Sequence, residues 1–77
     1  MPTVLYKNGF KFFFYANEHL PKHIHISKAD DFAKYDLEND IFIINYFNKN
    51  ETNIILDLIN ENKSFFKDKW DEYFNKG

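Results

Sequence analysis

The three histidines of the chain fall within seven residues, at His19, His23 and His25. Imidazole is the side chain that both gives and takes a proton near neutral pH. Two imidazoles on one strand face therefore suit acid–base cleavage of a phosphodiester. In this hypothesis His23 and His25 are the catalytic acid and base, and His19 supplies a third polar group.

Four polar side chains flank the histidines and complete the candidate site. Lys22 and Lys28 stand at either end of the His23–Ser27 segment, and we predict that they contact a phosphate. Asn17 and Glu18 precede the segment and are assigned as further substrate contacts. Because lysine is a point charge without the planar fork of arginine, phosphate binding here depends on single charges and imidazoles.

Two other interpretations fit the same residues. His23 and His25 are plausible metal ligands, with His19 or Glu18 completing the set. Alternatively the segment has no chemistry, so that His19 and Pro21 shape a turn and the other two histidines are half-exposed strand residues. The sequence leaves these alternatives open. Our prediction is the acid–base site, without a metal or other cofactor.

The histidines need a strand to position them, and residues 23–27 predict one. Polar and β-branched apolar residues alternate in this segment, which is the period of a strand with one buried face. Ile24 and Ile26 should face the core. The alternation then places His23, His25 and Ser27 on the opposite face.

Further strands are predicted on both sides of this segment. Val4–Tyr15 contains two β-rich runs around Asn8-Gly9, a dipeptide typical of a two-residue hairpin turn. Asp31–Leu37 and Ile41–Phe47 are also predicted strands, separated by a turn at residues 38–40. The first hairpin should carry aromatic side chains on both faces of its second strand: Phe10, Phe12 and Phe14 on one, and Phe13 and Tyr15 on the other.

The period changes from Glu51 onward, which predicts a helix. Apolar residues there recur at spacings of three and four. Asn50 is the predicted N-cap. The polar residues 60–64 weaken the stripe, so a break with Ser64 capping a second helix is an alternative. The residues of the stripe are Ile54, Ile55, Leu58, Ile59, Phe65, Phe66, Trp70, Tyr73 and Phe74.

These elements predict one domain over residues 1–77 of the α+β class. We expect a small antiparallel sheet of four to five strands, covered on one face by the C-terminal helix. Ile24, Ile26, Ile55, Leu58 and Trp70 should share one core. Because one helix covers one face, the other aromatic face should bind a small protein partner or a second copy of the chain.

Composition narrows the function classes. With 77 residues and no cysteine, the chain has neither disulfides nor thiolate sites, and its 21% aromatic residues must build the core. The formal charge is −2 and every basic residue is lysine, which disfavours a strong nucleic-acid binder but leaves RNA as a possible partner. No apolar run is long enough for a membrane span and no signal-peptide pattern precedes Val4, so we expect a cytoplasmic protein without membrane contact.

Several motifs together resemble a known family of small bacterial proteins. They are Gly9 to His19 (GFKFFFYANEH), followed by Pro21, His23 and His25, and then Ala33-Lys34-Tyr35, Leu37-Glu38, Glu61-Asn62 and Trp70-x-Glu72-Tyr73-Phe74. The sequence is similar in these motifs to the domain of unknown function numbered four-one-six-zero. The resemblance covers nearly the whole chain.

The resemblance implies a role in a toxin–antitoxin-type module, because members often sit beside a gene for another small uncharacterised domain. It assigns no catalytic residues. The predicted function is a toxin-like protein that cleaves RNA or another phosphodiester without a metal. The alternative is a non-enzymatic interaction module, either an antitoxin or a small inhibitor, that uses the aromatic open face and an edge strand.

Overall fold

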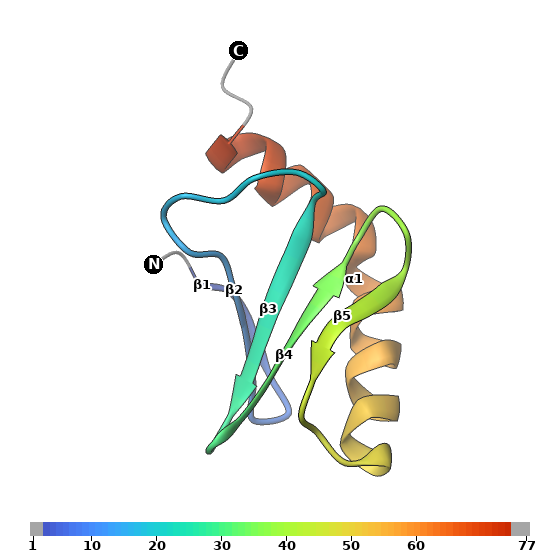
Figure 1. Ribbon diagram of the computed structural model, residues 1–77. Helices are drawn as coiled ribbons and strands as arrows, with labels where there is room; N and C mark the ends of the chain where they lie inside the picture. The colour runs from blue at the N-terminus through green and yellow to red at the C-terminus, as the bar shows by residue number, and fades with distance from the viewer. Residues whose placement is uncertain (1–2, 75–77) are drawn as a thin grey trace.

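The computed structural model describes residues 3–74, which form one antiparallel sheet of five strands and one helix (Figure 1). The strands lie in the sheet in their chain order, and the helix packs across one face. The predicted α+β fold is therefore confirmed. The elements are β1 (Thr3–Lys7), β2 (Phe10–Phe13), β3 (His23–Lys28), β4 (Asp31–Asp36), β5 (Ile41–Asn45) and α1 (Lys49–Phe74).

The first hairpin forms as the sequence predicts. Lys7 pairs with Phe10 across the turn, and Asn8 and Gly9 have φ values of 54° and 81°. Two consecutive positive φ values define the turn type whose twist matches that of the flanking strands. Asparagine and glycine tolerate this conformation better than other residues, so the dipeptide sets the register of β1 against β2.

The last strand is shorter than predicted and contains an irregularity. It ends at Asn45 rather than Phe47, because the Asn45 side chain accepts a hydrogen bond from the backbone N–H of Phe47 at 3.0 Å. The register also shifts by one residue, since Tyr35 pairs with Phe42 but Lys34 pairs with Ile44. Such a bulge re-aims the side chains that follow it.

The N-cap of the helix lies two residues before the predicted one, and the helix begins at Lys49. Asn48, not Asn50, is the N-cap, because its Oδ1 atom accepts a hydrogen bond from the Glu51 N–H at 2.8 Å. The Asn48 carbonyl accepts from the Thr52 N–H at the same distance. Asn50 lies within the first turn of the helix, where Asn is tolerated but has no capping role.

The single predicted helix forms rather than the alternative with a break near Ser64, because α1 continues without interruption from Lys49 to Phe74. The buried residues keep their helical spacing across the polar stretch, and Asn62 bonds back to the Leu58 carbonyl at 2.8 Å. Asn60, Glu61 and Ser64 are exposed, and the half-buried Lys63 pairs with Asp40 of the turn between β4 and β5. Within residues 3–74, no helix combines the length and apolarity needed to cross a membrane.

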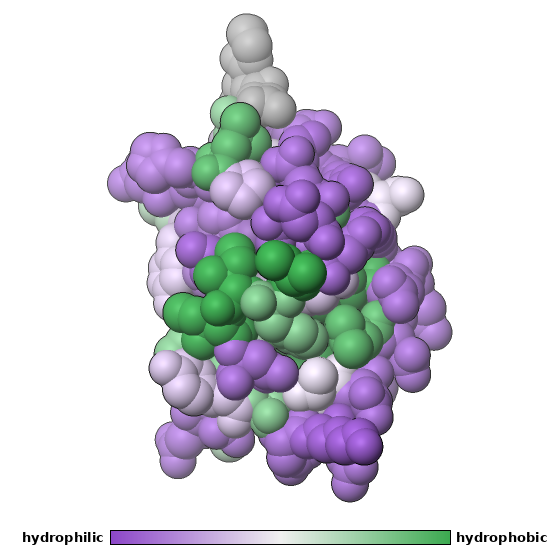
Figure 2. Space-filling model, turned by 45° about the vertical axis from the view of Figure 1, so that its right-hand side comes forward, coloured by the Kyte–Doolittle hydropathy of each residue, from purple (hydrophilic) through white to green (hydrophobic). Residues whose placement is uncertain are grey.

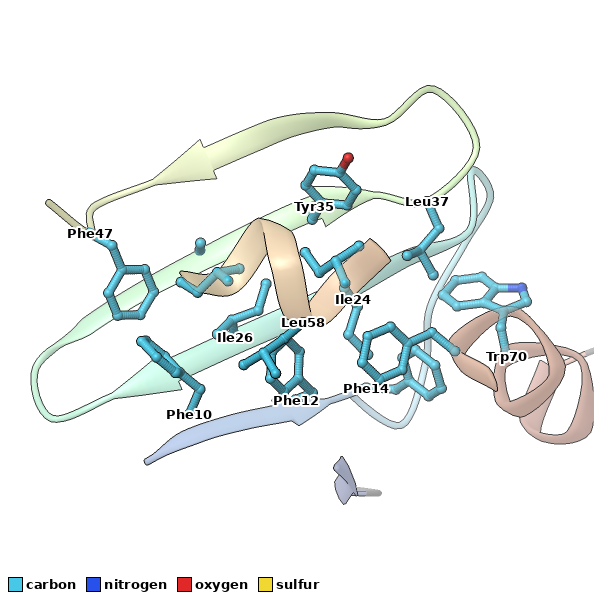
Figure 3. Packing of buried hydrophobic residues seen from close by; sticks show 14 residues of the cluster. Phe10, Phe12, Phe14, Ile24, Ile26, Tyr35, Leu37, Phe47, Leu58 and Trp70 are labelled. Carbon is cyan, nitrogen blue, oxygen red and sulfur yellow. The ribbon is translucent and has the colours of Figure 1, made fainter. Parts of the chain in front are cut away.

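One core lies between the helix and the covered face of the sheet (Figure 3). The predicted shared core of Ile24, Ile26, Ile55, Leu58 and Trp70 is confirmed. Aromatic rings fill the rest: Phe12 stacks on Phe66 at 5.2 Å between ring centroids, and Phe14 meets the edge of Trp70 at 5.5 Å. Large rings allow a short chain to bury a substantial apolar area.

A buried carboxylate closes the turn between β4 and β5. Asp36 accepts hydrogen bonds from the Glu38 N–H at 2.8 Å, the Asn39 N–H at 2.9 Å and the Asn39 side-chain amide at 2.8 Å. Burial acts to raise the pKa of Asp36, but these hydrogen bonds and the charge of His23 outweigh it and lower the pKa.

We expect Asp36→Ala to lower the free energy of unfolding by about 2 to 3 kcal/mol, because it leaves two backbone N–H groups of this turn without their acceptor. Chemical denaturation measures the change. Asp30→Ala is the control, since Asp30 is exposed in the preceding turn and should change stability by less than about 0.5 kcal/mol. Equal losses in the two variants would contradict the role given to Asp36.

Candidate functional site

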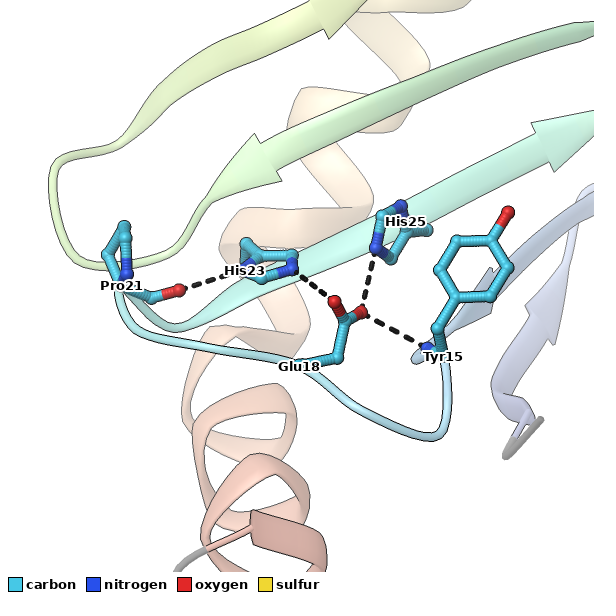
Figure 4. Close-up of polar contacts among 5 residues, drawn as sticks. All are labelled: Tyr15, Glu18, Pro21, His23 and His25. Atoms are coloured by element: carbon cyan, nitrogen blue, oxygen red, sulfur yellow. Dashed lines mark hydrogen bonds and ion pairs between the residues drawn. The ribbon is translucent and has the colours of Figure 1, made fainter.

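The Glu18 carboxylate lies between two imidazoles (Figure 4). Its Oε1 atom is 2.9 Å from Nε2 of His23, and its Oε2 atom is 2.8 Å from Nε2 of His25. The backbone N–H of Tyr15 also donates to Oε2, at 3.1 Å. Glu18 thus fastens the segment between β2 and β3 to the histidine face of β3.

The connection from residue 14 to residue 22 positions Glu18. It carries a cis peptide bond between Leu20 and Pro21, and the Pro21 carbonyl accepts from Nδ1 of His23 at 2.7 Å. Its last residue, Lys22, is bound through its backbone: the N–H donates to the Glu38 carboxylate at 2.7 Å, and the carbonyl accepts from the Leu37 N–H at 2.8 Å. The end of the connection next to β3 is therefore held by hydrogen bonds to His23, Leu37 and Glu38.

His23 is more buried than the sequence predicts. The acid–base prediction places it on the uncovered face of the sheet, but its side chain is 4% exposed. Strand alternation is not violated. The connection before β3 covers His23 at the beginning of the strand. The Trp70 ring, from the last turns of α1, also packs against it, with 5.0 Å between the ring centroids. His25 lies two residues further along and is 13% exposed.

Charge and burial compete within this group. Burial acts to raise the pKa of Glu18, but the Tyr15 N–H, the His23 hydrogen bond and the charges of both imidazoles lower the pKa below its usual value. Burial lowers the pKa of His25, and the Glu18 charge and hydrogen bond only partly offset this effect. These directions favour a carboxylate beside a neutral His25.

The two histidines differ in how their nitrogens are used. Both ring nitrogens of His23 are engaged, because they face the oxygen atoms of the Pro21 carbonyl and the Glu18 carboxylate. His25 uses Nε2 toward Glu18, and its Nδ1 atom makes no hydrogen bond within residues 3–74. Because no buried side-chain polar atom of that range lacks a partner, Nδ1 of His25 is accessible to solvent.

A pocket of about 250 Å³ adjoins His25 on the open face of the sheet. The residues that line it include Phe13, Tyr15, Ser27 and Phe32. Phe13 stacks on the His25 ring at 5.4 Å between centroids, and Tyr15 meets its edge at 4.6 Å. The predicted division of the aromatic residues 10–15 between the two faces is thus observed, since Phe10, Phe12 and Phe14 belong to the core.

Only part of the predicted site comes together. Glu18, His23 and His25 form the cluster, whereas His19 is exposed in the connection outside it. The ammonium group of Lys22 pairs with Asp71 at 2.9 Å. The ammonium group of Lys28 pairs with Glu51 at 3.4 Å and lies over the Phe10 ring. Both lysines therefore point toward the helix, and Asn17 is exposed in the connection.

Two neighbours of the cluster were not predicted as site residues. Tyr15 supplies its amide to Glu18 and its ring to the pocket, and Lys34 is the cross-strand partner of His25. Strand alternation would have found Lys34, since it faces the same side as His25 when the two strands pair in this register. The same rule places Lys22 and Lys28 on the side of Ile24, away from the histidines.

The chain belongs to the family described as Domain of unknown function (DUF4160), whose pattern matches residues 9–71. This agrees with the resemblance seen in the sequence, and the matched range includes the whole Glu18, His23 and His25 cluster. No curated protein and no solved structure matches the chain.

Proposed function

We propose that the protein is a cytoplasmic interaction module of a toxin–antitoxin-type pair that binds a small protein partner through an apolar patch around β5. We define the β5 patch by its exposed members, which are Phe32, Ile41, Ile43, Ile44 and Tyr46. This patch is the observation that carries the proposal. Its exposed fractions range from 40% for Ile44 to 62% for Tyr46.

Three members of the β5 patch lie close together on one face of the sheet. The Phe32 and Tyr46 rings are 4.8 Å apart, and Ile44 lies on the same face through its pairing with Lys34. In Figure 2, which brings the right-hand side of Figure 1 forward, apolar surface gathers in the middle of the molecule with hydrophilic surface above and below it. A contiguous apolar surface of this kind marks an interaction site more often than isolated residues do.

The position of the patch supports a protein partner. In the sheet order β1-β2-β3-β4-β5, the last strand is an edge, so one side of its backbone is unpaired within residues 3–74. Edge strands of soluble proteins usually carry charges that prevent association, but the five residues of β5 are four apolar residues and Asn45. A partner strand added at this edge would bury the isoleucines and pair the free backbone groups.

The test is binding to a small protein encoded next to the gene for this chain, which is the partner that the proposal requires. We expect Ile44→Ser combined with Tyr46→Ser to weaken that complex by at least about 30-fold, because two exposed anchors of this kind contribute about 1 to 2 kcal/mol each. Isothermal titration calorimetry measures the affinity. Sedimentation of the chain alone tests whether a second copy occupies the patch instead.

The matched control is Ile54→Ser combined with Phe65→Ser, two residues of α1 that are exposed to a similar extent but lie outside the β5 patch. The control should keep the affinity within about threefold, and both double variants should keep the melting temperature of the parent. An affinity that survives the β5 substitutions, or falls equally with the control, would refute the proposal.

The second candidate is the toxin-like phosphodiesterase, and the solvent-accessible Nδ1 atom of His25 favours it. Glu18 orients the imidazole from Nε2, and the opposite nitrogen is available to a substrate near the pocket that contains Phe13 and Tyr15. A carboxylate that holds an imidazole in this way is a common arrangement for a general base. In this candidate we assign His23 a positioning role rather than that of the acid, because both its nitrogens are engaged.

This candidate predicts that His25→Ala abolishes RNA cleavage or growth arrest on induction, with at least a 100-fold loss of rate. His19→Ala should leave the rate unchanged, because His19 is exposed outside the cluster. Cleavage of a labelled RNA by the purified protein provides the measurement. If His25→Ala retains the activity of the parent, the second candidate is wrong and the β5 proposal is unaffected.

A further inference from the structure

We infer that Glu18, His23 and His25 bind one divalent transition-metal ion of the zinc class. The ligand atoms that the three residues offer all lie within 4.8 Å of one another. Two imidazole nitrogens and one carboxylate form a ligand set found in metal sites that keep a position open for water or substrate. This site goes beyond the β5 patch and uses none of its residues.

In the protein without an ion, the three side chains already point their ligand atoms toward one another. The Nε2 atoms of both histidines are directed at the Glu18 carboxylate, at 2.9 and 2.8 Å. In a tetrahedral zinc site with bonds of about 2.0 to 2.1 Å, neighbouring ligand atoms lie somewhat more than 3 Å apart. An opening of a few tenths of an ångström between the carboxylate and the imidazoles would therefore admit the ion in place of the Nε2 protons.

The surroundings of His23 support the same conclusion. Its Nδ1 atom is 2.7 Å from the Pro21 carbonyl, which fixes the proton on Nδ1 and directs Nε2 at the cluster. Histidine ligands of metals almost always donate their other ring nitrogen to a carbonyl or carboxylate. Without an ion, both nitrogens of this buried ring face oxygen atoms. A metal on Nε2 would leave Nδ1 as the donor to the Pro21 carbonyl.

The ion would have a structural effect on the connection between β2 and β3. Glu18 comes from that connection and both histidines come from β3, so the ligands join two parts of the chain that lack a shared ladder of hydrogen bonds at this point. A metal bond should hold them together more strongly than the three hydrogen bonds to the carboxylate do. Binding should therefore raise the melting temperature.

Metal binding and the phosphodiesterase candidate exclude each other in their simplest forms. An imidazole bound to metal through Nε2 carries its proton on Nδ1 and is no longer a base there. A metal at this site would instead present an open coordination position beside His25. The metal titration therefore also discriminates between a metal-independent phosphodiesterase and a metal-binding protein.

The experiment uses the full chain, stripped with a chelator and titrated with Zn²⁺ alone. We expect one ion per chain with a Kd of about 1 μM or tighter, and a higher melting temperature with the ion than without it. Substitution with Co²⁺ should give the visible absorption of a four- or five-coordinate ion. Nitrogen NMR of the unmodified protein should show metal on Nε2 of His23 and His25 while His19 is unchanged.

The variants Glu18→Gln and His25→Gln should weaken Zn²⁺ binding by at least about 100-fold, because each removes one of three ligands. His19→Gln is the matched control and should keep the affinity of the parent. The inference is wrong if Zn²⁺ binds more weakly than about 1 mM, or if His19→Gln loses as much affinity as His25→Gln. The NMR result on the unmodified chain keeps the test valid should a variant fail to fold.

Discussion

Trp70→Ala is expected to cause the largest loss of stability of any single substitution considered, about 3 to 5 kcal/mol. Trp70 is 1% exposed and contacts Phe14, Phe74 and His23 at 4.5 to 5.5 Å between ring centroids. A domain of this size has a total stability of about 4 to 12 kcal/mol, so the variant should be partly or largely unfolded at 37 °C. Thermal and urea denaturation followed by circular dichroism measure the loss.

The control for this prediction is Tyr73→Ala, which removes another aromatic ring from the same end of α1. Tyr73 is 45% exposed and should cost less than about 1 kcal/mol. A loss in Trp70→Ala no greater than that in Tyr73→Ala would show that the end of the helix is not part of the core. Because Trp70 also contacts His23, the variant should in addition weaken the Glu18 cluster.

The sequence predicted the sheet and the helix well because burial follows the periods of these elements. The alternation around Ile24 and Ile26 and the spacing of Ile55, Leu58 and Trp70 each reflect one buried face, and all five residues share the core. Details that depend on competing local choices were predicted less well. Residues 48–50 include two asparagines that suit a helix N-cap, and periodicity alone does not decide between Asn48 and Asn50.

The candidate site was predicted only in part, because its central residue lies in an irregular segment. Glu18 precedes β3 by five residues and lies in a connection without regular secondary structure. Such a segment has no hydrophobic period from which the direction of a side chain could be predicted. His23 and His25 were correctly placed on one face of a strand. The burial of His23 required knowledge that the connection and Trp70 close over the strand end, which is a tertiary contact between distant residues.

Strand alternation predicts the face on which Lys22 and Lys28 lie, and it contradicts their assignment to the histidine site. Lys22 and Lys28 were assigned to the histidines by closeness in sequence, although strand alternation places them with Ile24 and Ile26. Their ion pairs with Asp71 and Glu51 are consistent with that side of the sheet. In a strand, residues two apart share a face and adjacent residues do not. For residues of one strand, an even spacing therefore predicts membership of the same site better than closeness along the chain does.

Glu18→Ala is expected to lower the free energy of unfolding of the metal-free protein by about 3 kcal/mol, although Glu18 lies in a connection and not in the core. Its side chain is 9% exposed and accepts hydrogen bonds from His23, His25 and the Tyr15 N–H. Removing the shared acceptor leaves the buried Nε2 atom of His23 without a partner, which costs more than the loss of an exposed ion pair.

Glu18→Gln separates the contribution of the hydrogen bonds from that of the charge. The amide oxygen can still accept from His23, and the amide nitrogen can donate to His25 if that ring changes its tautomer. This variant should therefore lose less stability than Glu18→Ala, about 1 to 2 kcal/mol. Hydrogen exchange of the Tyr15 amide should accelerate in both variants, and in His19→Ala it should match the parent. An unchanged exchange rate in Glu18→Ala would show that the carboxylate does not hold the connection to β3.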